Sequence, residues 1–416
     1  MPVTKSYRTP GVYVEEVPSG PRPIQAVGTS TAGFVGIAPN PEVRVNEAVA
    51  INNWSQFERV FVPERDPRST PLSNAVYGFF ENGGGRCFVV NVGLEGSVTG
   101  AGKGRVGLEV LEAVDDVSMV LIPGYTGAAE HESALSHCEK LKDRVAILDP
   151  PEDVSDIGRL LELETATAEP KKKPATGTSG GATTTATAPV ATSSGMHPRP
   201  SEYGTFYFPW LTVLDPLESF LTDVPPSGHM AGIWARTDTT RGVHKAPANE
   251  IVRGALNLTY RLTREEQGEL NEAGVNCIRL FGREGIRVWG ARTLGDQSGP
   301  WRYLNVRRLF NMVEESIGQS TNWIVFEPND RTLWKNIRRD VSAFLTLLWR
   351  DGALMGRSPE EAFFVKCDEE TNPQEIIDQG QVVTVVGMAP VKPAEFIVFQ
   401  LSQSTSGAEV MAEGRS

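Results

Sequence analysis

Three glycines are the first candidates for chemistry in this chain. Gly102, Gly104 and Gly107 fit the G-x-G-x-x-G spacing, which binds dinucleotide phosphates when it joins a strand to a helix. The preceding strand pattern already ends at Val92, and the next one runs past Ile122 into a Pro-Gly turn, where a ribose-binding carboxylate would be expected. The spacing therefore favours a glycine hairpin. An α/β nucleotide-binding enzyme remains the alternative from a different class.

The histidines and cysteines lack the paired spacing of a metal site or a redox pair. They are His131, His137, His197, His229 and His244, and Cys87, Cys138, Cys277 and Cys367. Asp149 ends a strand pattern at a position where α/β enzymes place catalytic acids, but Pro150 and Pro151 follow, and one carboxylate makes no mechanism. We therefore predict no catalytic residue, no cofactor and no metal, and a protein that is not an enzyme.

Composition excludes several kinds of partner. The formal net charge of -12 argues against nucleic acid as the main partner, because phosphate binding needs a basic surface. No apolar run approaches the roughly 20 residues that cross a membrane, and the opening MPVTKSYRTPG lacks the apolar core of a secretory signal. We expect a protein that is made and folded in the cytoplasm, without direct membrane insertion. A length of 416 residues predicts two domains, or one domain with an insertion.

The N-terminal two thirds of the chain alternates strand and helix patterns. The expected strands are 28–38, 86–92, 117–122 and 144–148, with another resuming at Tyr203, and the expected helices are 72–80, 129–141 and 154–163. Such alternation is typical of βαβ units and a parallel sheet, so the fold class is α/β, or α+β overall. We expect His131 and His137 to flank a solvent-facing helix and His229 to lie in a loop.

Two stretches interrupt this pattern by their composition. Residues 165–200 consist largely of Thr, Ala, Gly, Ser and Pro, which bury too little surface to offset the entropy of ordering, so we predict a disordered insertion. Residues 236–308 are rich in arginine, which suggests ion pairs with acidic side chains of this chain or of another copy.

The C-terminal third predicts two long helices, 307–317 and 333–349, and two strands, 362–367 and 381–386. Asn329 or Asp330 can cap the second helix, whose apolar stripe faces a core. Its opposite face carries Lys335, Arg338 and Arg339, which are free to meet an acidic partner. An ordinary exposed amphipathic helix explains the same pattern.

Both ends of the chain carry a short strand pattern on an extended arm. Near the N-terminus it is Val12, Tyr13 and Val14, bracketed by prolines and glycine; near the C-terminus it is Phe396, Ile397, Val398 and Phe399, after Pro390 and Pro393. The second pattern is apolar on both faces, as in a strand buried within a sheet. An isolated strand is not stable. Each arm therefore completes a sheet of its own domain or of a neighbouring subunit.

Several blocks of sequence resemble the contractile tail sheath family. They are TPGVYVEEVPSGPRPIQAVGTSTAGFVG, PPSGHMAGIWARTDTTRGVHKAPANE, NEAGVNCIRLFGREGIRVWGARTL, WRYLNVRRLFNMVEESI, FEPND and APVKPAEFIVFQLSQ. The blocks span nearly the whole chain except residues 165–200. That insertion is the departure from the family pattern.

The resemblance implies a structural subunit of a contractile sheath, which polymerises as stacked hexameric rings around an inner tube and contracts to drive the tube through an envelope. The implied partners are other copies of the chain, the inner tube protein, and baseplate and terminal cap proteins. Assembly in the bacterial cytoplasm is implied, as an injection system or, alternatively, as a prophage or myovirus tail. In the family, both arms reach into neighbouring subunits, and here Lys335, Arg338 and Arg339 are the candidates for the tube contact.

The expected domain organisation follows from these elements and from the resemblance. Residues 1–23 form an N-terminal strand arm, and residues 24–275 form an outer domain that contains the insertion 165–200. Residues 276–390 form an inner, tube-facing α/β domain. Residues 391–416 form a C-terminal strand arm with a polar tail.

Overall fold

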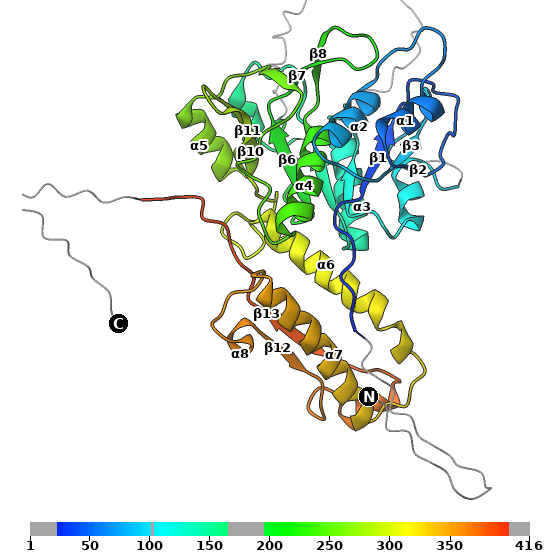
Figure 1. Cartoon of the computed structure of the whole chain (residues 1–416), viewed down its shortest axis with the longest axis vertical. Coiled ribbons are helices and arrows are strands. Elements are labelled where there is room, and N and C mark those ends of the chain that lie inside the picture. The colour runs from blue at the N-terminus through cyan, green and yellow to red at the C-terminus, as the bar shows by residue number, and fades with distance from the viewer. Residues whose placement is uncertain (1–22, 101–103, 165–194, 399–416) are drawn as a thin grey trace, which may run out of the picture.

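An eight-stranded mixed sheet is the centre of a large domain, residues 32–303, in the computed structural model (Figure 1). The structure describes residues 23–100, 104–164 and 195–398. The strand order is β11-β10-β6-β5-β4-β1-β3-β2. The strands are β1 Ala32–Gly36, β2 Val49–Ile51, β3 Cys87–Asn91, β4 Met119–Leu121, β5 Val145–Leu148, β6 Gly204–Phe208, β10 Val275–Phe281 and β11 Gly285–Val288.

The pairing within this sheet is parallel except at its two edges. The run β10-β6-β5-β4-β1-β3 is parallel throughout, whereas β11 and β2 pair antiparallel at the edges. All residues of β1, β3, β4, β5 and β6 are buried, as expected for strands with helices on both faces. The predicted α/β class with a parallel sheet is confirmed.

Side chains that alternate along the strands supply two separate cores. Phe34 and Tyr207 point to one face, towards helices α2 and α4, while Val35 and Phe206 point to the other, towards α3. The elements of this domain outside the sheet are α1 Trp54–Phe61, α2 Pro71–Glu81, η1 Gly107–Ala113, α3 Ala128–Leu141, η2 Ile157–Leu160, α4 Ser227–Arg241, α5 Arg264–Glu272, and a small antiparallel sheet of β7 Leu211–Leu214, β8 Leu221–Val224 and β9 Ala255–Leu258.

Helices α2 and α4 approach each other at glycine positions. A Cβ atom at Gly228 would lie 2.2 Å from the Ala75 carbonyl oxygen, and one at Gly232 would lie 2.4 Å from the Phe79 carbonyl oxygen. Any larger residue would force the two backbones apart. The PPSGHMAG segment is therefore the start of a helix rather than the loop that was expected, and His229 is buried within α4.

A C-terminal module, residues 304–388, projects from the large domain (Figure 1). It contains α6 Leu304–Ser320, η3 Asn322–Ile324, α7 Arg331–Arg350, α8 Pro359–Ala362, β12 Phe363–Lys366, α9 Gln374–Asp378 and β13 Val385–Met388. Strands β12 and β13 form a two-stranded antiparallel sheet, and α6 and α7 share a third core with it. Asp330 caps α7 as predicted, since its carboxylate accepts hydrogen bonds from the backbone N–H groups of Thr332 and Leu333.

A predicted helix and a predicted domain boundary are wrong. Residues 154–163 form only the short 3₁₀ helix η2. The domain boundary at residue 276 falls within β10, which is hydrogen-bonded into the large sheet, so the C-terminal module begins after β11. Residues 165–194 of the predicted disordered insertion 165–200 lie outside the described residues. Its last residues are ordered, because His197 is buried and forms a β-bridge with Leu163.

Candidate assembly surfaces

The C-terminal arm follows β13, and its first residues are hydrogen-bonded to the rest of the C-terminal module. Ala389 donates its N–H to the Ala362 carbonyl oxygen at 2.9 Å, and Val391 donates to the Ala353 carbonyl oxygen at 3.2 Å. The carbonyl oxygen of Val391 accepts a hydrogen bond of 3.0 Å from Asn305 Nδ2 in α6. Residues 389–391 are thus fixed to the C-terminal module.

The arm then reaches the large domain through Glu395. Its carboxylate accepts two hydrogen bonds from the Arg292 guanidinium, at 2.9 Å from Nε and 2.6 Å from Nη2. The Tyr303 hydroxyl donates a third, longer bond of 3.4 Å. The Arg292 side chain is 6% exposed and that of Glu395 is 18% exposed, so this ion pair is largely shielded from water.

The three residues that follow Glu395 extend away from the body (Figure 1). Phe396, Ile397 and Val398 are 76%, 74% and 79% exposed, and they pair with no strand of the described part of the chain. Of the two alternatives for this arm, a strand of the chain's own sheet has no pairing among the described residues to support it. Phe399, and the N-terminal candidates Val12, Tyr13 and Val14, lie outside the described residues.

The two-stranded sheet of the C-terminal module lacks neighbours at its outer edges among the described strands. Phe364 of β12 and Val385 of β13 are 58% and 43% exposed. A groove of about 400 Å³ lies beside β13. Its lining residues come from α6, α7, the connection between them, β13 and the segment just before β13, and include Ile317, Ile337 and Val386. Two strands alone make a marginal sheet, and unpaired edges accept further strands.

The segment that leads back to the N-terminal arm lies along α6. Ile24 is buried in the core of the C-terminal module. Gln25 and Val27 donate their backbone N–H groups to the hydroxyls of Ser320 and Ser316, at 3.2 and 3.0 Å. The described chain therefore begins alongside the C-terminal part of α6, and residues 1–22 of the predicted N-terminal arm lie outside the described residues.

A buried ion pair joins α6 to the large domain. Arg308 lies 2.5 Å from Asp238 of α4, and the side chains of both residues are at most 5% exposed. Thr29 adds a hydroxyl hydrogen bond of 2.6 Å to the same carboxylate and accepts one from Arg308 through its carbonyl oxygen. The Trp234 ring lies under the Arg308 guanidinium at 4.7 Å. Three segments that are distant in sequence meet at this pair.

Five of the twelve arginines in residues 236–308 form ion pairs within the chain. Their partners include Glu250 for Arg236, Glu284 for Arg287, Glu395 for Arg292, Glu202 and Glu314 for Arg307, and Asp238 for Arg308. The arginine-rich stretch therefore holds this fold together. For these five arginines the alternative of pairing with another copy is not needed.

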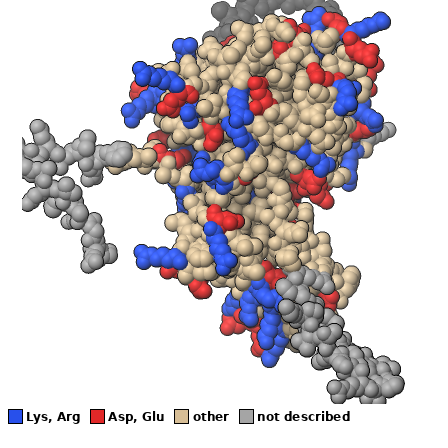
Figure 2. Space-filling model, viewed as in Figure 1, with Lys and Arg blue, Asp and Glu red and all other residues tan. Residues whose placement is uncertain are grey.

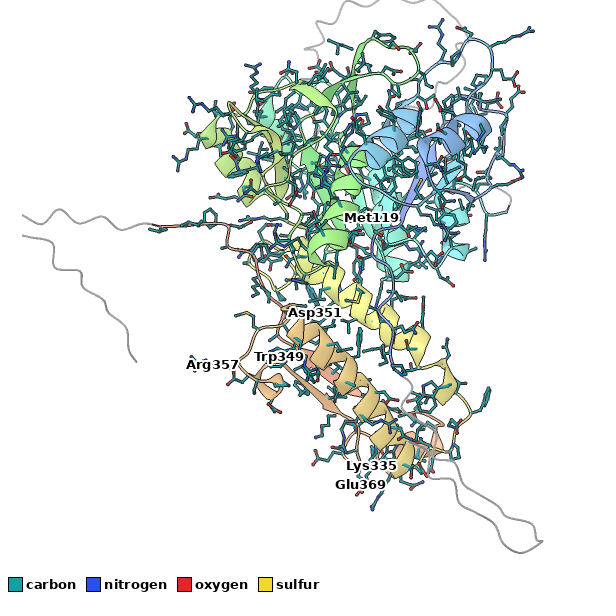
Figure 3. All side chains as sticks on the ribbon, viewed as in Figure 1. Met119, Lys335, Trp349, Asp351, Arg357 and Glu369 are labelled. Atoms are coloured by element: carbon teal, nitrogen blue, oxygen red, sulfur yellow. The ribbon has the colours of Figure 1, made fainter. Side chains whose placement is uncertain are left out.

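The predicted basic face of α7 is exposed, with Lys335, Arg338 and Arg339 in the open. Arg339 bonds the neighbouring Asp340 at 2.9 Å, whereas no ion pair of Lys335 or Arg338 occurs within the described residues. Figure 3 shows Lys335 and Glu369 at the far end of the C-terminal module, where Glu369 pairs with Arg331 at 2.6 Å. Figure 2 shows that basic and acidic side chains gather together at this end.

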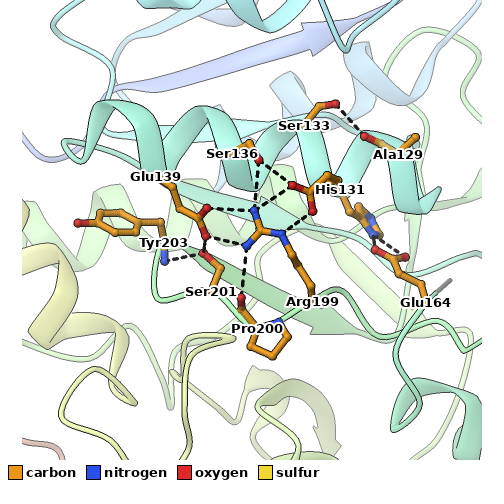
Figure 4. A network of polar contacts seen from close by, with 11 residues as sticks. Ala129, His131, Ser133, Ser136, Glu139, Glu164, Arg199, Pro200, Ser201 and Tyr203 are labelled. Atoms are coloured by element: carbon orange, nitrogen blue, oxygen red, sulfur yellow. Dashed lines mark hydrogen bonds and ion pairs between the residues drawn. The ribbon is translucent and has the colours of Figure 1, made fainter. Parts of the chain in front are cut away.

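The polar residues near the insertion are structural. His131 is buried, and its ring nitrogens contact the Glu164 carboxylate and the Asp149 carbonyl oxygen, each at 3.1 Å, so the expected solvent-facing position is wrong. Arg199 joins Glu139 at 2.8 Å and also bonds Glu132 (Figure 4). These contacts secure the two flanks of residues 165–194 to α3.

Asp149, the carboxylate at the end of β5, serves the start of a helix. Its oxygens accept hydrogen bonds from the backbone N–H and the hydroxyl of Ser227, at 2.8 and 2.6 Å, where α4 begins. Burial raises the pKa of Asp149 to about 7, and the two bonds from Ser227 oppose that rise. A carboxylate at a helix N-terminus satisfies unpaired backbone donors, so the position has a structural explanation.

The glycine motif is not arranged as a phosphate site in the part that the structure describes. Gly107 opens the 3₁₀ helix η1 rather than an α-helix, and its N–H donates to the Asn46 side chain at 3.0 Å. A Cβ at Gly107 would lie 2.5 Å from the Ser97 and Val98 carbonyl oxygens, so the chain's own backbone fills this space. Gly102 lies outside the described residues. Gly104 lies in a bend before η1, and Gly107 is the first residue of η1.

No group of histidine, cysteine and acidic side chains suited to a metal ion occurs within the described ranges. The four cysteines are buried and unpaired. Among the described residues, no helix has both the length and the apolar character required to cross a bilayer.

Two family models match adjoining ranges that together cover more than half of the chain. The phage tail sheath protein central domain matches residues 172–294, and the phage tail sheath C-terminal domain matches residues 296–404. The tail sheath protein of Vibrio phage KVP40 is 28% identical over 189 residues, which are 45% of this chain and 27% of that protein. The match thus spans about a quarter of the phage relative.

Solved sheath structures match over nearly the whole chain. The sheath complex of an extracellular contractile injection system, PVC, in its contracted state is 30% identical, with a TM-score of 0.76, and covers 97% of this chain and 99% of that one. The contracted helical sheath of the anti-feeding prophage is 29% identical, with a TM-score of 0.72, over 96% and 100% of the two chains. This chain belongs to the phage tail sheath family.

Proposed function

We propose that this protein is the structural subunit of a contractile sheath, which polymerises as stacked rings around an inner tube and contracts to drive that tube through a target envelope. The observation that supports the proposal is an unpaired apolar segment and a two-stranded sheet with unpaired edges on one molecule. Phe396–Val398 extend from the body without a partner, and the β12–β13 sheet has free edges within the described chain. Strand addition between copies satisfies both.

Donated strands suit a lattice that must move without coming apart. Each backbone hydrogen bond contributes about 1 kcal/mol, and burial of an apolar side chain such as Phe396 adds roughly 2 kcal/mol. A few such contacts make a joint that holds while the rigid bodies of neighbouring subunits rotate. No nucleotide is needed by the sheath itself, since the energy is released by new contacts between subunits.

An injection system is favoured over a phage tail as the setting. Among solved structures, the contracted injection-system sheaths are 29–30% identical to this chain with TM-scores of 0.72–0.76, whereas the sheath tail protein Lin1278 of Listeria innocua is 10% identical with a TM-score of 0.54. The other partners in this proposal are an inner tube protein, a baseplate and a terminal cap, with assembly in the bacterial cytoplasm. A chain in the contracted baseplate of the anti-feeding prophage is also 30% identical, with a TM-score of 0.73, which supports a baseplate contact.

Negative-stain electron microscopy of the purified chain tests this proposal. We expect rings, tubes or contracted cylinders, because each subunit carries both donor and acceptor. A small monodisperse oligomer that binds a nucleotide would instead favour the α/β enzyme.

We further propose that the basic face of α7, defined by Lys335, Arg338 and Arg339, contacts acidic side chains of the inner tube. The support is the exposure of all three side chains and the absence of an ion pair for Lys335 and Arg338 within the described chain. Opposite charges across an interface guide assembly and fix register.

Reversal of these three charges to glutamate is expected to reduce the fraction of inner tubes covered by extended sheath at least about tenfold, because attraction becomes repulsion. Electron microscopy of tubes and sheaths after co-expression measures that fraction. The matched control reverses three exposed arginines of the large domain, Arg65, Arg264 and Arg283. Normal extended sheaths in the α7 variant would reject the tube contact.

A further inference from the structure

The C-terminal arm is held by two kinds of anchor that differ in strength and in the body to which they attach. The hydrogen bonds of Ala389 and Val391 are neutral. They attach the arm to the C-terminal module, which includes α6. The contact of Glu395 with Arg292 is a bidentate ion pair. Charge-assisted bonds of this kind are roughly twice as strong as neutral ones.

Arg292 is itself rigidly built into the large domain. Its Nη1 donates to the Asn271 carbonyl oxygen at 2.7 Å, at the end of α5. Its backbone N–H and carbonyl oxygen both bond the Asn276 side chain in β10, at 2.7 and 2.8 Å. An antiparallel bridge to Tyr303 completes its surroundings. Glu395 therefore attaches the arm to the eight-stranded sheet rather than to the module from which the arm comes.

The Glu395–Arg292 ion pair determines which part of the subunit bears a pull on the arm from a neighbouring subunit. Glu395 immediately precedes Phe396, the first residue of the free strand. Without the anchor, a pull on the strand would act first on the neutral hydrogen bonds of residues 389–391 and then on β13, which has four residues and pairs with β12 alone among the described strands. A two-stranded sheet pulled from one end opens one hydrogen bond at a time and is marginally stable.

We propose that Glu395 is the positioning residue of the donated strand: its ion pair with Arg292 fixes the point at which the strand leaves the subunit and transfers tension to the large domain. The strand is then presented in a restricted set of directions, and pre-organisation of this kind strengthens association. The inference rests on the proposed function of the arm in strand donation. It adds the residue pair that sets the geometry of donation.

Distance measurements between two spin labels test the anchor in the unassembled chain. One label replaces Val398 and the other replaces Glu265, an exposed residue of α5; the native cysteines are buried and do not compete for the label. We expect Glu395→Gln to broaden the distance distribution at least twofold, because the residues after 391 lose their attachment to the large domain. Lys392→Gln is the matched control, since it neutralises an exposed arm residue, and it should leave the distribution unchanged.

A second variant and a second readout separate positioning from folding. Glu395→Asp keeps a negative charge near Arg292 but is too short for the same bidentate contact, so it should broaden the distribution even if Glu395→Gln weakens the fold. Both variants should raise the critical concentration for polymerisation about fivefold, equivalent to roughly 1 kcal/mol, and Glu395→Asp, which keeps a carboxylate near Arg292, should do so at an almost unchanged unfolding temperature. An unchanged distance distribution in both variants would overturn the anchor.

The two proposals fail in different ways. If the wild-type chain never polymerises, the strand-donation function fails, while the distance measurement still decides on the anchor. If the wild-type chain polymerises and the Glu395 variants behave as the Lys392→Gln control in both readouts, the anchor alone is rejected.

Discussion

Truncation after Glu395 is expected to abolish polymerisation and to leave the monomer folded. The residues removed begin with Phe396, Ile397 and Val398, which are exposed and contribute nothing to any described core. The cut retains Glu395 and its contact with Arg292, so the arm base stays in place. Sedimentation measures assembly, and thermal unfolding should change by less than about 2 °C, the effect of a surface change in a domain of this size.

Truncation after Ser402 is the matched control. It removes only the polar tail and keeps the whole apolar strand pattern, so sheath formation should survive. Loss of the monomer's cooperative unfolding in the Glu395 truncation would mean that the strand closes the chain's own sheet. The joint between subunits would then have to lie elsewhere.

Asp238→Ala is expected to lower the free energy of unfolding by about 3–5 kcal/mol, because it leaves the buried guanidinium of Arg308 without its counterion. The substitution also removes the acceptor for the Thr29 hydroxyl, so the N-terminal segment along α6 is loosened. Chemical denaturation measures the effect. It is followed by the fluorescence of Trp234, whose ring contacts the Arg308 guanidinium.

Glu47→Ala supplies the contrast for this measurement. Glu47 and its partner Arg44 are both more than half exposed. Such surface ion pairs contribute less than about 1 kcal/mol to stability. If Asp238→Ala also lowers the free energy of unfolding by less than about 1 kcal/mol, the Arg308 pair does not hold α6 to the large domain.

Sequence patterns predicted those elements whose apolar and polar side chains repeat with the period of a helix or a strand. The stripe of Trp334, Ile337 and Val341 indicated α7, and the structure places it on the core of the C-terminal module. The alternation of strands and helices indicated the parallel sheet for the same reason, since a two-sided apolar strand must lie between layers. The exposed position of Lys335 and Arg338 followed from the opposite face of the same helix.

Features that depend on distant partners could not be read from the sequence. Glu395 looked like one polar residue at the edge of an apolar run, and only the fold brings it to Arg292. His131 occupies a helix of mixed composition, and its burial depends on Glu164 and Asp149 from other segments. The start of α4 has no sequence cap of its own because Asp149 supplies one from the end of β5.

The central claim is that the strand beginning at Phe396 is donated to the β12–β13 sheet of another subunit. Cryo-electron microscopy of sheaths assembled from the full chain tests it most directly. We predict that density for Phe396–Val398 will lie alongside β12 or β13 of a neighbouring subunit, with Glu395 still bound to Arg292 of its own. Density that returns to the sheet of the same subunit, or ends free in solvent within an ordered lattice, would contradict the account.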